Sequence, residues 1–98
     1  MADNDWSFAP PPFNAEQSLL QLQRAMRDCG LAARGKGFEL RGRAVVELDV
    51  RDGAIAARLA RRLVTTPEWD AFTVKSGADQ RKLIDEVKRR LARWADED

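Results

Sequence analysis

The side chains that could do chemistry in this chain are almost all carboxylates and cations. The 98 residues include 16 acidic and 17 basic side chains and one cysteine, with neither histidine nor tyrosine. Histidine is the usual proton carrier near neutral pH and the commonest metal ligand. Without it, no Ser–His or Cys–His nucleophilic pair can form within one chain. We therefore expect a non-enzymatic protein that holds no metal and no cofactor.

The remaining reactive or metal-binding candidates have simpler explanations. Cys29 falls on the apolar stripe of a predicted helix, where a thiol usually acts as a small buried hydrophobe. Asp49 and Asp52-Gly53 form half of a divalent-metal pattern, but the further ligands of a calcium loop are missing. Asp52 is interpreted instead as the N-cap of the helix that follows it.

Cations are concentrated in the middle third of the chain. Residues 34–66 carry eight arginines and lysines against four acids, whereas the whole chain has a net charge of +1. Seven of these cations are candidate contacts to phosphate or nucleic acid: Arg34, Lys36, Arg41, Arg43, Arg58, Arg61 and Arg62. The last three lie on a predicted helix, 54–63, that has no acid to pair with them. Such a patch suits weak nucleic-acid binding; the alternative is scattered surface arginines whose stems cover apolar area.

An RNA-binding sheet that stacks bases would need aromatic side chains on its open face. Phe38 and Phe72 are in phase with Leu40 and Val74, so they are predicted to face the core. The sequence therefore disfavours base stacking on the sheet.

Residues 1–13 form an aromatic and proline-rich segment ahead of the predicted domain. Trp6, Phe8 and Phe13 flank the run Pro10-Pro11-Pro12, which favours an extended polyproline path. Three interpretations of this flexible segment stay open: it is a frayed tail, it packs on the domain as a strap, or its three aromatic side chains bind a partner protein.

Residues 14–95 predict one α+β domain, followed by an acidic frayed tail at 96–98. Asn14 and Gln17 have the capping-box spacing and begin a helix over 15–29, which ends before Gly30. The other predicted elements are a loop over 31–37, strands 38–40 and 45–51 joined by a turn at 41–43, helix 54–63, strand 71–75, and a last helix capped by Ser76.

This order, α-β-β-α-β-α, predicts a two-layer sandwich with the helices mainly on one face of a three-stranded sheet. The favoured strand order is 2-1-3, wholly antiparallel; pairing of the third strand with the second would give a mixed sheet instead. The predicted core is Leu19, Leu22, Met26, Phe38, Leu40, Val46, Leu48, Val50, Ile55, Leu59, Leu63, Phe72, Val74, Leu83, Ile84, Val87 and Leu91.

Composition also gives expectations about class and function. A single cysteine, an acidic N-terminus and the lack of a long apolar run favour a cytoplasmic protein. Arginine outnumbers lysine 13 to 4, which is typical of a GC-rich bacterial genome. We expect a small protein-binding or adaptor module that recognises another protein or its own copy. The alternative is a weak nucleic-acid binder that uses the arginine-rich residues 34–62.

Overall fold

Two helices and five strands make up the computed structural model, which describes residues 13–96. Helix α2 spans Ala15–Asp28 and helix α3 spans Gly77–Asp96. Between them lie β1 (Ala32–Arg34), β2 (Gly37–Leu40), β3 (Arg43–Arg51), β4 (Ala54–Ala60) and β5 (Trp69–Val74).

The predicted three-stranded sheet is wrong. The five strands pair in sequence order, β1-β2-β3-β4-β5, and every pair is antiparallel. The chain is therefore an α+β domain built on a meander, with no βαβ crossover among the described residues. The predicted 2-1-3 order fails because it placed a helix where the third and fourth hairpins of the meander, β3–β4 and β4–β5, share a strand.

That strand is β4, which replaces the predicted helix 54–63. Its central position supplies backbone hydrogen-bond partners from β3 on one side and β5 on the other, which outweighs the helix preference of alanine, leucine and arginine. Asp52 and Gly53 are not a helix start. Both have positive φ, +52° and +75°, and they form the two-residue turn of the β3–β4 hairpin.

The two helix starts are confirmed. The Asn14 side chain accepts a hydrogen bond from Gln17 N–H at 3.0 Å. At α3, Asp79 N–H donates to Ser76 Oγ at 3.0 Å, while the Asp79 carboxylate accepts from Lys75 N–H at 3.2 Å. Each cap satisfies a backbone donor that the first helical turn leaves without a partner.

The region around the first hairpins holds one confirmed feature and one error. Arg41 and Gly42, with φ +56° and +78°, form the predicted turn between β2 and β3. The predicted loop 31–37 is wrong in part, because it contains β1. A bulge also interrupts the β2–β3 ladder between Phe38 and Glu39. Phe38 pairs with Val46 and Glu39 with Ala44, so Val45 of β3 is left without a partner residue in β2. Val45 and Val46 are both buried, as a bulge that turns two successive side chains to one face requires.

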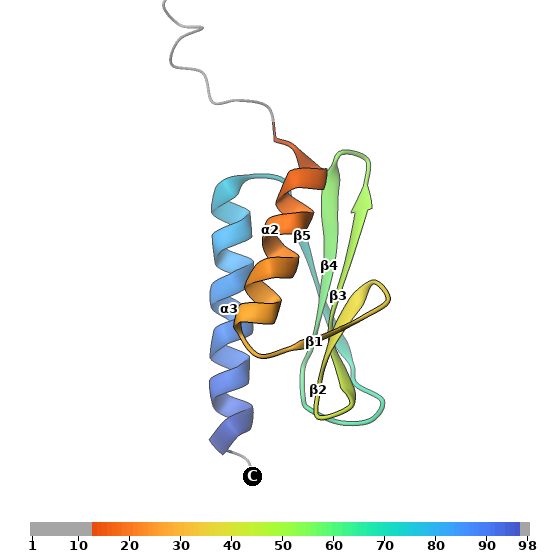
Figure 1. Cartoon of the computed structure of the whole chain (residues 1–98), viewed down its shortest axis with the longest axis vertical. Coiled ribbons are helices and arrows are strands. Elements are labelled where there is room, and N and C mark those ends of the chain that lie inside the picture. The colour runs from red at the N-terminus through yellow and green to blue at the C-terminus, as the bar shows by residue number, and fades with distance from the viewer. Residues whose placement is uncertain (1–12, 97–98) are drawn as a thin grey trace, which may run out of the picture.

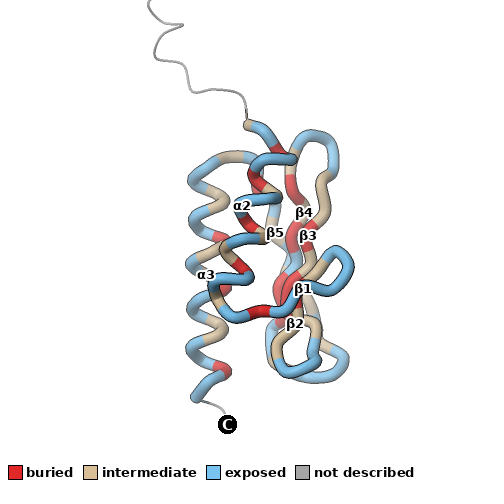
Figure 2. Tube along the Cα trace, viewed as in Figure 1, coloured by how far each residue is buried: buried red, intermediate tan, exposed pale blue. Residues whose placement is uncertain are grey.

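Both helices cover the same face of the sheet, and the opposite face is open (Figure 1). The buried positions lie between these two layers (Figure 2). Every residue of the predicted core belongs to this cluster, fully or partly buried. The structure adds buried side chains that the prediction lacked: Ala15, Leu31, Val45, Ala57, Ala60 and Trp94.

Candidate functional site

The candidate site is the edge of the sheet formed by β5, together with the side of α3 next to it. Strand β5 pairs with β4 over its whole length without a bulge, and no other described strand lies on its outer side. An edge strand leaves a row of backbone N–H and C=O groups without partners. The outer side of β5 is therefore a surface on which another strand can form.

The last backbone hydrogen bond between β4 and β5 shows which residues of β5 bond to β4 and which point their backbone groups away from it. Arg61 N–H donates to Glu68 C=O at 2.9 Å, one step beyond the last pair of the β4–β5 register. Backbone groups of antiparallel strands point alternately toward and away from a given neighbour. Asp70, Phe72 and Val74 consequently bond to β4, and the intervening residues Trp69, Ala71 and Thr73 direct their N–H and C=O groups outward.

The two edges of the sheet differ in how well they are protected. Strand β1, at the other edge, has three residues, and a bulge follows in the next ladder. Short edge strands and bulges are the usual defences against unwanted strand pairing, as are proline and lysine. Strand β5 has six residues, Trp69–Val74, and contains none of these. Its one charged residue, Asp70, is paired within the protein.

A hollow of about 280 Å³ lies beside β5, where the strand meets α3. Phe72, Val74 and Leu83 give it apolar walls, and Asp79, Lys82, Glu86 and Arg89 give it charged ones, with Thr73 completing the lining. An outward backbone edge next to a groove against a helix is the geometry that binds extended peptides by strand addition.

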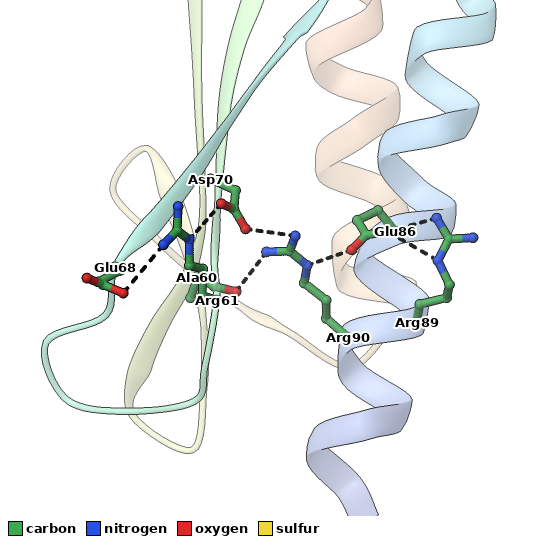
Figure 3. A network of polar contacts seen from close by, with 7 residues as sticks. All are labelled: Ala60, Arg61, Glu68, Asp70, Glu86, Arg89 and Arg90. Carbon is green, nitrogen blue, oxygen red and sulfur yellow. Dashed lines mark hydrogen bonds and ion pairs between the residues drawn. The ribbon is translucent and has the colours of Figure 1, made fainter.

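Charged side chains join α3 to the sheet behind this groove (Figure 3). Arg90, with 11% of its side chain exposed, contacts Asp70 at 2.9 Å and Glu86 at 2.7 Å and donates to the Ala60 carbonyl at 3.1 Å. Asp70 also accepts from Arg61 at 2.7 Å. Arg90 therefore connects the helical layer to the sheet.

These contacts lower the pKa of two carboxyls. Hydrogen bonding from Arg61, and then from Arg90, holds the pKa of Asp70 below its ordinary value, against an opposing effect of burial. Hydrogen bonds from Arg90 and Arg89 do the same to the pKa of Glu86. Both groups therefore remain ionised and paired at neutral pH.

Acid is expected to remove the stability that Asp70 contributes. Its folded-state pKa lies below the unfolded value, so the contribution is present above about pH 4 and is lost as the pH falls through the folded-state pKa. In urea unfolding, wild type should exceed Asp70→Asn in stability at pH 7, and the difference should shrink below pH 4. Glu68→Gln, a change at an exposed partner of Arg61, is the control and should show little difference. A difference for Asp70→Asn that stays constant with pH would contradict the assignment.

The open face of the sheet carries a second, wider hollow of about 490 Å³. Lys36, Glu47, Asp49, Arg51 and Arg58 are among its lining residues, and Ala56, Ala71 and Thr73 contribute small side chains. The charges pair with one another: Arg58 of β4 with Glu47 of β3, Lys36 of the β1–β2 turn with Asp49 at 3.4 Å, and Arg51 with Asp49 of the same strand at 2.9 Å. These pairs leave this face with little unbalanced charge.

The seven predicted phosphate contacts do not form one patch of unpaired cations. Four have acidic partners: Arg34 with Glu39, Lys36 with Asp49, Arg58 with Glu47, and Arg61 with Glu68 and Asp70. Arg41 is in the β2–β3 turn, and Arg43 and Arg62 make no ion pair with residues 13–96. Residues 54–63 contain no acid, but the fold supplies acidic partners from other segments. Glu47 of β3 pairs with Arg58, and Glu68 of the β4–β5 loop and Asp70 of β5 pair with Arg61.

The structure places one of the three predicted partner-binding aromatics. Phe13 is partly buried against the core, at the start of the described chain. Trp6 and Phe8 lie outside the described residues. Cys29 is the C-cap of α2 and is partly exposed. The predicted 2-1-3 order also placed strand 71–75 at an edge, but beside the first predicted strand; its true neighbour, β4, was missed because residues 54–63 were predicted to be a helix.

Residues 13–96 contain no group of three or more cysteine and acidic side chains arranged to hold a metal ion. Neither described helix combines the length and apolar character needed to cross a membrane. Comparison of the chain with protein-family models, curated proteins and solved structures finds no match. The candidate site therefore rests on the geometry of this chain alone.

Proposed function

We propose that this chain is a non-enzymatic protein-binding module that accepts an extended segment of a partner as an additional strand beside β5. The observation that carries the proposal is the regular outer edge of β5, along which none of residues 13–96 forms a further strand. The outward N–H and C=O groups of Ala71 and Thr73 would supply the affinity, because main-chain hydrogen bonds are the common element of strand addition. The groove against α3 would receive side chains.

Two other candidates receive less support. A second copy of the chain could pair its own β5 with the same edge. Analytical ultracentrifugation of the free protein tests this alternative, because it distinguishes a monomer from a dimer. Weak nucleic-acid binding by residues 34–62 is the further alternative, but four of its seven cations already contact acids. Binding of mixed DNA and RNA pools at low salt, lost when Arg58 and Arg62 become alanine, would favour the nucleic-acid candidate.

Amide hydrogen exchange should reveal the free edge directly. In the unbound protein, the amides of Phe72 and Val74 should exchange slowly, because they bond to β4, and those of Ala71 and Thr73 should exchange rapidly. A peptide selected on the full chain from a displayed library of random ten-residue sequences should slow exchange at Ala71 and Thr73 by about tenfold or more. Selected peptides that leave both amides unchanged would overturn the proposal.

Proline substitution separates the edge from the fold. Ala71→Pro removes an outward N–H and leaves the β4 ladder intact, a change that edge strands tolerate. It should abolish peptide binding while the thermal transition persists. Ala71→Ser retains the N–H and serves as the matched control, with binding unchanged. If Ala71→Pro does not fold, Thr73→Pro provides the same test at the next outward N–H. A folded proline variant that binds the peptide with wild-type affinity would contradict strand addition.

A further inference from the structure

The groove between β5 and α3 would receive every second side chain of an added strand. Residues opposite Phe72 and Val74 point to the helix side of the sheet, and residues opposite Ala71 and Thr73 point to the open face. Successive groove-facing positions of the added strand lie about 7 Å apart. One helical turn advances about 5.4 Å, so two such side chains meet successive turns of α3.

The acids that line this groove are already engaged. Both oxygens of Glu86 accept hydrogen bonds, from Arg89 at 2.7 Å and from Arg90 at 2.7 Å. The carboxylate of Asp79 accepts from Lys75 N–H at the start of α3. Two arginines therefore offset the charge of Glu86. Asp79 bonds to a neutral donor and keeps its charge, which the N-terminus of α3 offsets in part.

The cations of the groove are more available. Lys82 is exposed and makes no ion pair with residues 13–96. Arg89 keeps 70% of its side chain exposed although it contacts Glu86. Lys82 is therefore the group of the groove best placed to contact a negative charge.

Lys82 lies at the end of the groove where β5 leads into α3. The chain leaves β5 at Val74 and enters α3 soon after, and the two elements run antiparallel, since Arg90 reaches back to Asp70. Lys82 is thus nearer to Val74 than to Asp70. Phe72 occupies the next groove-facing position, where the guanidinium of Arg90 lies 5.8 Å from its ring centroid.

We infer, on the basis of the proposed strand addition, that the groove selects extended segments with an acidic side chain two residues from an apolar one. The apolar side chain lies opposite Phe72, and the carboxylate lies opposite Val74 and contacts Lys82. The groove then distinguishes partners by charge, while the edge of β5 binds the main chain of each.

Matched synthetic peptides test this inference. The probes are threonine-rich ten-residue peptides that carry valine and, two positions away, aspartate, asparagine or lysine. Fluorescence anisotropy with the full chain at low salt should give about fivefold tighter binding for the aspartate peptide than for the asparagine peptide, with the lysine peptide weakest. The ratio should fall toward one at high salt.

Lys82→Ala should remove the preference for aspartate over asparagine, and Lys82→Arg should restore it. Lys88→Ala is the matched control, because Lys88 is an exposed lysine of the same helix that does not line the groove. Equal affinities for the three peptides, with Ala71 and Thr73 still protected from exchange, would overturn the inference and leave strand addition standing. Binding without protection of those amides would overturn both.

Discussion

Replacement of Leu22 by alanine is expected to lower the free energy of unfolding by about 3–4 kcal/mol. Leu22 is fully buried, with 0% of its surface exposed, at the centre of the face that α2 turns to the sheet. The substitution loses the transfer free energy of the removed carbon atoms and leaves a cavity that the surroundings fill only in part. Urea unfolding followed by circular dichroism measures the loss.

Leu20→Ala is the matched control for this prediction. Leu20 lies two residues away on the same helix with 66% of its surface exposed, so its truncation should change stability by less than about 0.5 kcal/mol. Since both variants remove the same atoms and introduce the same helix former, their difference isolates burial. Equal losses for the two variants would mean that α2 does not present this face to the sheet.

Replacement of Arg90 by alanine is expected to cost about 2–3 kcal/mol. Its guanidinium contacts Asp70 and Glu86, donates to the Ala60 carbonyl, and lies over the ring of Phe72. Truncation leaves two carboxylates without their shared partner and removes a stem that packs between the helix and the sheet. The loss is below that of a fully buried pair, because water reaches both carboxylates.

Arg89→Ala provides the comparison for Arg90. Arg89 also contacts Glu86 at 2.7 Å, but its side chain is 70% exposed, so the loss should stay below about 0.5 kcal/mol. Arg90→Lys keeps the charge but lacks the planar fork that reaches several acceptors at once, and it should recover less than half of the lost stability. Similar losses for Arg89→Ala and Arg90→Ala would contradict a connecting role for Arg90.

Prediction from sequence succeeded where the signal is local. The cap at Asn14 and the cap at Ser76 depend on side chains three residues from the donors that they satisfy. The turn at Arg41-Gly42 depends on a glycine that tolerates positive φ. In each case the residues that decide the structure are neighbours in the chain, so their pattern can be read directly.

Strand β4 shows why the sheet was predicted wrongly. Ile55 and Leu59 are four residues apart, a spacing that places them on one face of a helix and also on one face of a strand. Ala57, which is buried between them, fits only the alternating pattern of a strand. Alanine is also common on the exposed faces of helices, so its presence at position 57 did not indicate a buried strand residue. Asp52-Gly53, a strong hairpin signal next to alternating β3, was the feature that could have identified β4.

The candidate site was only partly within the reach of sequence reasoning. The predicted 2-1-3 order also puts strand 71–75 at an edge, but the pairing of β5 with β4 and the groove against α3 depend on the order of all five strands, which no residue of β5 encodes by itself. The charge argument failed in the same way: Arg58 finds Glu47 eleven residues earlier, across a strand pair that the prediction lacked.

The sequence by itself determined the two helices, their caps, one hairpin turn and the apolar positions of the core, because each follows from spacing within a few residues. Only the tertiary structure decided that residues 54–60 pair as a strand, that four of the seven candidate cations have acidic partners, and that β5 pairs with β4 and borders a groove against α3. Those features depend on contacts between segments far apart in the chain, where main-chain pairing on both sides outweighs local preference. The scarcity of catalytic side chains directed attention to surfaces, and the fold identified the edge of β5 as the surface to test.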